Sequence, residues 1–240
     1  MKKIFFDFLN EMIFPQNGKC VVCSKVLFIA DSNLCDNCKD KLIYTRKMKC
    51  ISCSSFFEEP DLGEICSECR HKYGIIQNGC SLYKYSGTAK GIIQDFKYKN
   101  NPQGAYIVGE RLYEKLKLYQ WFSSVDIIIP VPISKQRNLQ RGYNQSYYIA
   151  KAISDRSNIA IYEDCLIKIK ETQDQIELSG KERFDNLKDC YSCDDRVFGK
   201  NILIVDDVFT TGATILECSK TMKDVGAAQI YMATVATTIV

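Results

Sequence analysis

Four Cys-x-x-Cys pairs within the first 70 residues restrict the possible folds of this 240-residue chain more than any other sequence feature. The gaps between successive pairs are eleven, eleven and twelve residues, which is the period expected of two stacked zinc ribbons or knuckles. Two such turns hold four sulfurs at about 2.3 Å from one ion. We therefore predict two zinc ions, with the ligands Cys20, Cys23, Cys35, Cys38, Cys50, Cys53, Cys66 and Cys69.

These zinc ions are expected to be structural, because a closed set of four cysteines leaves no open position for a substrate. A segment of about 50 residues with little apolar content cannot build its own core, so the metal supplies folding free energy. An iron–sulfur cluster and redox dithiols are the alternatives. Ligation in sequence, four cysteines per ion, is the simplest arrangement, and the near-equal gaps leave an interleaved one open.

The pattern of apolar and charged residues predicts neither a signal peptide at the N-terminus nor a membrane span. Its apolar stretch is interrupted by Asp7 and Glu11, so it does not read as a signal peptide. Helical spacing instead predicts a short amphipathic helix that ends at Pro15. We expect this helix to pack on its own protein, with binding to a membrane surface or a partner as the alternative. No run of about 18 uncharged apolar residues occurs, so no transmembrane helix is expected. Cysteine pairs without a secretory signal indicate a reducing, cytoplasmic location.

A change of pattern divides the chain into two predicted domains. The cysteine pairs end at Cys69, and the polar stretch "RHKYGIIQNG" follows. We place the boundary near residue 76, which gives an N-terminal helix and zinc domain over 1–75 and a second domain over 76–240. The second domain alternates helical segments with short apolar strands. This order predicts an α/β fold, a mostly parallel sheet with helices on both faces.

The predicted elements of the second domain follow from hydrophobic period. Apolar residues at helical spacing predict helices over 87–101, 105–122, 144–154 and about 214–225, the last one ended by Gly226. Continuous apolar runs predict buried strands over 125–134 and 201–208, and a last strand is expected over 229–240.

The stretch "ILIVDDVFTTGAT", residues 202–214, is the clearest candidate for a binding site. Two adjacent carboxylates at the end of a buried strand repel each other, so they need a compensating partner. Asp206 and Asp207 suit a pair of ribose hydroxyls or a Mg²⁺ ion. The following turn suits a phosphate, because Gly212 permits close approach of the backbone and threonine hydroxyls lie beside free N–H groups. Its residues are Thr210, Thr211, Gly212, Ala213 and Thr214.

This stretch resembles the phosphoribosyl pyrophosphate (PRPP) motif of type I phosphoribosyltransferases. The resemblance implies that Asp206 and Asp207 hold the ribose hydroxyls and that residues 210–214 hold the 5′-phosphate. It also implies Mg²⁺ as a cofactor with PRPP. Some purine-using members carry an aspartate at the position of Thr210 as general base. This chain does not, so neither the general base nor the acceptor is identified.

The cysteine pairs, "DIIIPVPISKQRNLQRGYNQS" and "QDQIELSGKERFDN" together resemble the ComF (ComFC-like) competence family. In that family a zinc-ribbon segment precedes a phosphoribosyltransferase domain. The resemblance implies pyrophosphate binding after "PVP" and a hood between Lys168 and Asn186. Solvated surface charge and helix capping are the alternatives for the pyrophosphate candidates Ser134, Lys135, Arg137, Arg141, Asn144 and Gln145.

Three functions are compatible with this resemblance. One is a Mg²⁺-dependent phosphoribosyltransferase with an unknown acceptor, and another is a non-catalytic PRPP or nucleotide sensor. A third is a single-stranded-DNA-binding factor in DNA uptake, with a competence helicase or other uptake proteins as partners. Residues 80–141 hold ten Lys/Arg against four Asp/Glu, interleaved with aromatic residues. Such a segment suits single strands, although core aromatics among solvated lysines would give the same pattern.

Overall fold

The structure is a computed structural model of the chain. Its described residues are 19–20, 22–27, 34–45, 50–55, 65–66, 69, 74–170 and 186–238. The predicted N-terminal helix and most of the predicted hood lie outside these residues.

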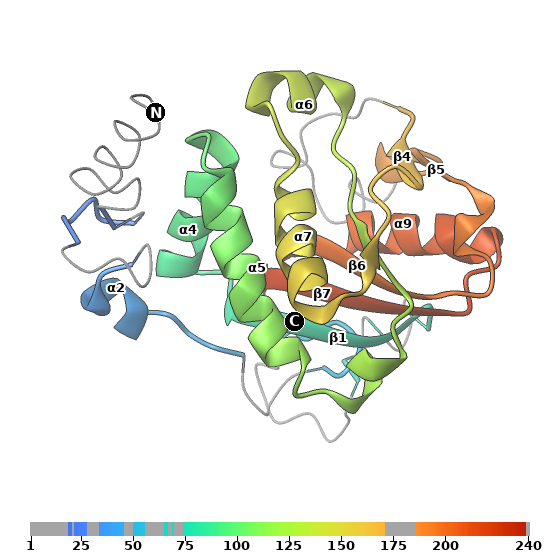
Figure 1. The fold of residues 1–240 in the computed structure, drawn as a ribbon, viewed down its shortest axis with the longest axis horizontal. Coiled ribbons are helices and arrows are strands. Elements are labelled where there is room, and N and C mark those ends of the chain that lie inside the picture. The colour runs from blue at the N-terminus through green and yellow to red at the C-terminus, as the bar shows by residue number, and fades with distance from the viewer. Residues whose placement is uncertain are drawn as a thin grey trace, which may run out of the picture.

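A five-stranded parallel sheet forms the centre of the molecule (Figure 1). Its strand order is β1-β7-β6-β2-β3, and each neighbouring pair is parallel. The central strands are almost wholly buried, as their continuous apolar sequences predict. The strands are β1 (Ile76–Lys84), β2 (Ile127–Pro130), β3 (Ala160–Ile161), β6 (Asn201–Phe209) and β7 (Gln229–Thr237).

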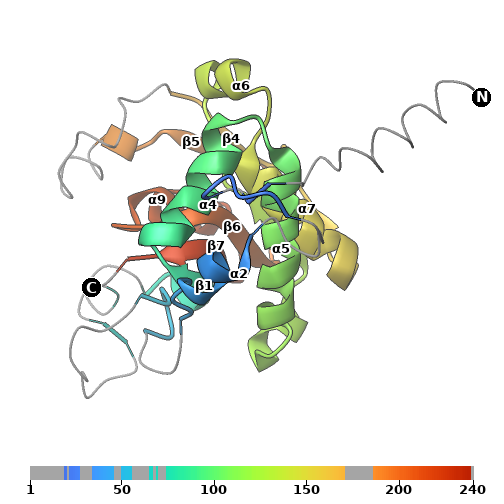
Figure 2. The same ribbon diagram turned by 90° about the vertical axis from the view of Figure 1, so that its left-hand side faces the viewer.

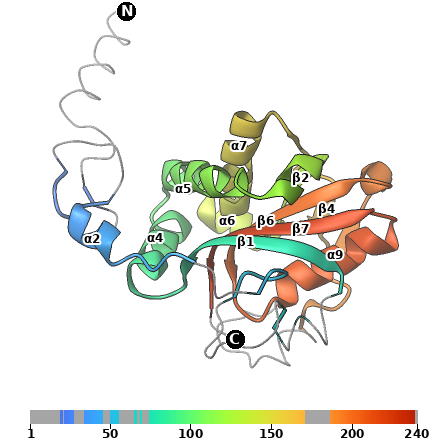
Figure 3. The ribbon, with the colours of Figure 1, turned by 90° about the horizontal axis from the view of Figure 1, so that it is seen from below.

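Helices cover both faces of this sheet, which confirms the predicted fold class. Three of them pack on one face, namely α4 (Gly87–Tyr98), α5 (Pro102–Leu116) and α7 (Gln145–Ser157). On the opposite face lies α9 (Ala213–Asp224), as the view from below shows (Figure 3). Gly226, with φ of 100°, follows α9 as predicted.

Several short elements were not predicted from the sequence. They include a second, antiparallel sheet of two strands, β4 (Leu166–Lys168) and β5 (Tyr191–Cys193). The others are β3, α2 (Asp36–Asp40), α6 (Lys135–Arg141) and two 3₁₀ helices, η1 (Gln120–Ser124) and η2 (Asp195–Val197). The predicted strand over 125–134 is shorter than expected, because Pro130 and Pro132 lack the N–H needed to extend the ladder.

The edge strand β1 begins where the sequence predicted only a domain boundary. Its partner on one side is β7. On its other side it is covered by residues 43–45 and 50–55 of the cysteine-rich part. Backbone hydrogen bonds join Thr45 N to Leu82 O at 2.9 Å and Gly79 N to Ile51 O at 2.8 Å. The cysteine-rich part therefore covers the outer edge of β1 through backbone hydrogen bonds.

Close contacts on both sides of the sheet fix this arrangement. A Cβ atom on Gly79 would lie 2.3 Å from the carbonyl oxygen of Ser52, so only glycine fits there. The first cysteine cluster lies on the side of α4, where a Cβ on Gly91 would touch Val22 at 3.3 Å. In Figure 2, which looks at the molecule from this side, α2 lies in front, and Figure 3 shows that its neighbouring helix is α4. We keep residue 76 as a proposed domain boundary, although the two parts share apolar clusters.

No helix among the described residues is both long and apolar enough to cross a membrane.

Candidate functional site

The eight predicted cysteine ligands form two clusters, each made of consecutive pairs. Within each cluster the four Sγ atoms lie within 4.8 Å of one another. The Cys23–Cys35 and Cys53–Cys66 Sγ distances are 3.7 and 3.8 Å. A tetrahedron with metal–sulfur bonds of about 2.3 Å has sulfur–sulfur edges of about 3.8 Å, so the donor sets fit one zinc ion each. The arrangement is sequential rather than interleaved.

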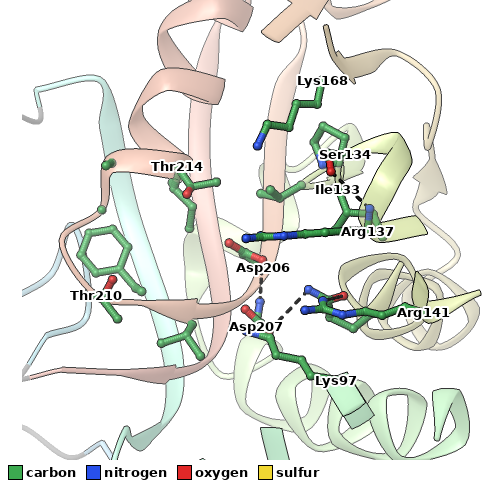
Figure 4. A pocket seen from close by; sticks show the side chains of 18 of the residues that line it. Lys97, Ile133, Ser134, Arg137, Arg141, Lys168, Asp206, Asp207, Thr210 and Thr214 are labelled. Carbon is green, nitrogen blue, oxygen red and sulfur yellow. Dashed lines mark hydrogen bonds and ion pairs between the residues drawn. The ribbon is translucent and has the colours of Figure 1, made fainter. Parts of the chain in front are cut away.

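A separate cavity of about 590 Å³ opens at the carboxyl ends of β2 and β6 (Figure 4). The chain leaves these two adjacent strands in opposite directions, toward β3 and toward β7. Ligands of open α/β sheets bind at such a switch point. Because β2 ends at Pro130, opposite Val205, the next residues of β6 extend past it. This difference in length makes room for the cavity beside Asp206 and Asp207.

Asp206 is held by two hydrogen bonds. Its Oδ1 accepts from Ser146 Oγ and from the backbone N–H of Asp207, both at 2.9 Å. Only 8% of the residue is exposed. Burial, and then the charge of Asp207, raise the pKa of Asp206 to about 7. Ionisation of this carboxyl is therefore poised near neutral pH.

Asp207 forms an ion pair with Lys97, which lies in the last turn of α4. The Asp207 side chain is 6% exposed and that of Lys97 is 21% exposed. Burial alone would lower the pKa of Lys97, but the attraction of Asp207 outweighs it and raises this pKa. The repulsion between the two aspartates is thus relieved within the protein. Lys97 was not predicted from the sequence, since no motif links it to Asp207.

The predicted phosphate loop, residues 210–214, lines the same cavity. The strand β6 ends at Phe209, and Gly212 has φ of 76°, a conformation that glycine adopts without strain. The helix α9 begins at Ala213, directly after it. Intrahelical hydrogen bonds do not use the N–H groups of a helix's first turn, so this end of α9 suits an anion.

The helix α6 carries two predicted pyrophosphate ligands, Arg137 and Arg141, to the opposite side of the cavity. They are four residues apart and so share one face of the helix. The Oγ of Ser134 also lines the cavity and caps α6 by accepting from Arg137 N at 3.3 Å. Lys135, which was predicted as a pyrophosphate ligand together with them, is exposed and does not line the cavity.

Asn144 and Gln145 play different structural roles. Asn144 is the N-cap of α7, where its Oδ1 accepts from Ser146 N at 3.0 Å, and it does not line the cavity. Gln145 is buried and lines it. Its Oε1 accepts from Arg141 Nη1 at 2.8 Å, and its Nε2 lies 3.5 Å from Asp207 Oδ2. Gln145 therefore connects the arginine to the acidic pair.

The cavity contains further residues that were not predicted individually as site residues. Lys168 of β4 and Tyr191 of β5 face each other across their ladder and both line it. Tyr98 is 65% exposed at the cavity, and the Arg141 guanidinium lies 5.4 Å from its ring centroid. Four cationic side chains and two carboxylates therefore line the cavity, which favours an anionic ligand. The cations are Lys97, Arg137, Arg141 and Lys168.

Comparison with known domains divides the chain as the cysteine pattern does. A model of the double zinc ribbon domain matches residues 9–70. A model of the phosphoribosyl transferase domain matches residues 148–239, which include the acidic pair and the phosphate loop.

Relatives with similar sequences match nearly the whole chain. "Competence protein F" of Haemophilus influenzae is 28% identical over 225 residues, covering 90% of this chain and 95% of the relative. "DNA utilization protein YhgH" of Escherichia coli is 25% identical over 218 residues, covering 90% and 95%. "Competence protein ComFC" of Streptococcus pneumoniae is 24% identical over 226 residues, covering 88% and 96%.

Two solved structures are also similar. A purine phosphoribosyltransferase from Pyrococcus horikoshii aligns with a TM-score of 0.33 at 19% identity, covering 54% of this chain and 71% of that chain. A glutamine PRPP amidotransferase from B. subtilis aligns with a TM-score of 0.37 at 17% identity, covering 74% and 33%.

Proposed function

We propose that this chain, which is related to the ComF competence proteins over nine-tenths of its length, binds PRPP or a related ribose phosphate. The observation that carries the proposal is the meeting of three groups in one cavity. They are the acidic pair of β6, the small-residue loop before α9 and the arginines of α6. Their chemistry matches the hydroxyls, the 5′-phosphate and the pyrophosphate of PRPP.

Each group would hold one part of the ligand. Asp206 and Asp207 accept hydrogen bonds from the ribose hydroxyls. Residues 210–214 donate backbone N–H groups and hydroxyls to the 5′-phosphate. Arg137 and Arg141 bind the pyrophosphate, since guanidinium groups grip phosphate oxygens in pairs. In a transfer reaction, an acceptor atom would form a bond to the anomeric carbon as the carbon–oxygen bond to pyrophosphate breaks, and the pyrophosphate would leave on the side of these arginines.

The acidic pair also fits Mg²⁺, which prefers one or two carboxylates together with oxygens of a bound phosphate. The carboxylates of Asp206 and Asp207 both line the cavity and supply such donors. When bound with PRPP, the ion would neutralise charge on the pyrophosphate.

Calorimetric titration of PRPP into the zinc-loaded protein, with and without Mg²⁺, tests this proposal. We expect Mg²⁺-dependent binding that weakens by at least about 100-fold in Asp206→Asn/Asp207→Asn, because charged hydrogen bonds contribute about 1.5–3 kcal/mol each. For the same reason Arg141→Ala is expected to weaken binding by about 10-fold or more. Lys135→Ala removes the same charge outside the cavity and is the matched control. Unchanged binding in the double variant would show that the site is assigned wrongly.

Binding of single-stranded DNA is a second candidate function. One observation favours it in particular, the exposed Tyr98 ring beside Arg141 at the mouth of a cationic cavity. Stacking of bases on aromatic rings, together with contacts to phosphates, is how proteins hold single strands. Two curated relatives are named for competence and another for DNA utilization, which agrees with this function.

Fluorescence anisotropy with a labelled oligonucleotide tests this second function. We expect the affinity to fall steeply between about 50 and 200 mM salt, because bound phosphates release counterions. Tyr98→Ala is expected to weaken binding by about 1–3 kcal/mol, the contribution of one stacked base. The control is Leu139→Ala, which removes an exposed side chain of α6 that carries no ring. Affinity that does not depend on salt would rule this function out.

A further inference from the structure

We propose that Lys97 is an internal cation of the ligand site, which neutralises Asp207 in the free protein and moves to a phosphate oxygen when ligand and Mg²⁺ arrive. This inference rests on the proposed function and assigns a role to a residue outside the phosphoribosyl transferase motif. In this scheme Lys97 controls access of the metal to a carboxylate and then contacts the ligand directly.

The contacts of Lys97 place it between two kinds of partner. Its Nζ pairs with Asp207 Oδ2, and the lysine itself lines the cavity. The helix α4 brings it there from the face of the sheet that carries α5 and α7. Figure 4 shows Lys97 pointing to Asp207, with Arg141 close by. A single ammonium is therefore within reach of both the carboxylate and the space predicted for pyrophosphate.

The carboxylate of Asp207 cannot bind the Lys97 ammonium and a divalent cation at the same time without repulsion between the two cations. Two cations on one carboxylate repel each other strongly when they lie close together in a partly buried site. Binding of Mg²⁺ to the free site must therefore displace Lys97. A ligand that brings phosphate oxygens offers Lys97 a new anionic partner, so the exchange costs less when both arrive together. Lys97 thereby favours joint binding of metal and ligand over binding of metal alone.

The test measures binding of Mn²⁺, a spectroscopic substitute for Mg²⁺, to the zinc-loaded protein at pH 8 without PRPP. We expect wild type to bind Mn²⁺ weakly. Lys97→Met should bind it at least about tenfold tighter, since a competing charge is gone. Lys97→Arg keeps the charge and should resemble wild type. Lys97→Met/Asp207→Asn should lose the gain, which locates the metal at the acidic pair.

Thermal unfolding provides a second measurement on the same variants. Loss of Lys97 leaves a buried carboxylate without its partner, so Lys97→Met is expected to unfold at a lower temperature than wild type. Millimolar Mg²⁺ should restore much of that loss and should leave Lys97→Arg almost unchanged. If Lys97→Met is too unstable to purify, Lys97→Gln replaces it.

The outcomes separate this inference from the proposed function. Mn²⁺ binding that is no tighter in Lys97→Met, together with no rescue by Mg²⁺, would overturn the role of Lys97 even if PRPP binds. Tighter Mn²⁺ binding in Lys97→Met, with no binding of PRPP to any variant, would support the role of Lys97 and reject PRPP as the ligand.

Discussion

Exchange of Cys50 for serine is expected to unfold the parallel sheet as well as the cysteine-rich part. Cys50 is fully buried, and its cluster packs in the same apolar core as Ile76 and Met232 of the sheet. Residues 50–55 also bind the sheet directly. The Ser52 hydroxyl donates to Ile76 O at 2.8 Å, and the Ser55 hydroxyl lies 3.0 Å from that of Thr237 on β7.

The effect should be large because a structural zinc site contributes about 10 kcal/mol or more to folding. That is comparable to the whole stability of a typical domain, so we expect a fall in the unfolding temperature of more than about 10 °C, or no folded protein. Calorimetry and a zinc assay check this, with one zinc lost per chain.

Two variants serve as controls for Cys50→Ser. Cys193→Ser changes a half-buried thiol outside both clusters and should have a small effect. Cys23→Ser removes an exposed ligand of the first cluster, so it should destabilise less than Cys50→Ser. An unfolding transition of Cys50→Ser within about 2 °C of wild type would contradict the shared core, since such a shift corresponds to no more than about 1 kcal/mol.

Asp206→Asn is expected to stabilise the ligand-free protein at pH 8 while weakening PRPP binding. The folded pKa of Asp206 is about 7, against about 3.9 in an unfolded chain. Between these values the folded state binds more protons than the unfolded state, so this group's contribution to stability is lost as pH rises through 7. Above pH 7 the ionised carboxyl therefore costs up to about 4 kcal/mol, which asparagine avoids.

Melting temperatures at pH 5 and pH 8 measure this contribution. At pH 5 Asp206 is already protonated when folded, so asparagine should change little. At pH 8 the variant should melt about 5 °C or more above wild type, since 1 kcal/mol shifts a protein of this size by about 2–4 °C. Asp207→Asn is the matched control with the opposite sign, because it leaves Lys97 without its carboxylate. Equal melting temperatures for Asp206→Asn and wild type at pH 8 would refute the argument.

Local patterns explain which parts of the fold were predictable. The Cys-x-x-Cys turns fix their own geometry, and the apolar run of β6 ends at its functional residues, so both could be identified from the sequence. The strand β1 escaped prediction because Gln77, Asn78 and Gly79 interrupt its apolar pattern. Burial of β1 depends on β7 and on the zinc loops, residues 43–45 and 50–55, and none of these segments is adjacent to β1 in the sequence.

Parts of the candidate site were also not predictable from local sequence patterns. The helix α6 has a single apolar residue, Leu139, which is exposed, so no amphipathic period reveals it. A serine cap and Gly142 with φ of 76° define its ends instead. The partner of the acidic pair was missed for a different reason. Lys97 reaches Asp207 only because α4 packs on the sheet. The sequences around the two residues contain no pattern that predicts this ion pair.

The segments that cover β1 also protect the protein against aggregation through the edge of its sheet. A sheet with open edges offers unpaired N–H and C=O groups to other chains and so promotes aggregation. At one margin β3 has only two residues, which leaves little to pair with. At the other margin the zinc loops already occupy hydrogen-bonding groups of β1. Zinc starvation would then expose a nine-residue strand, and newly made protein would be at risk of assembling into insoluble material.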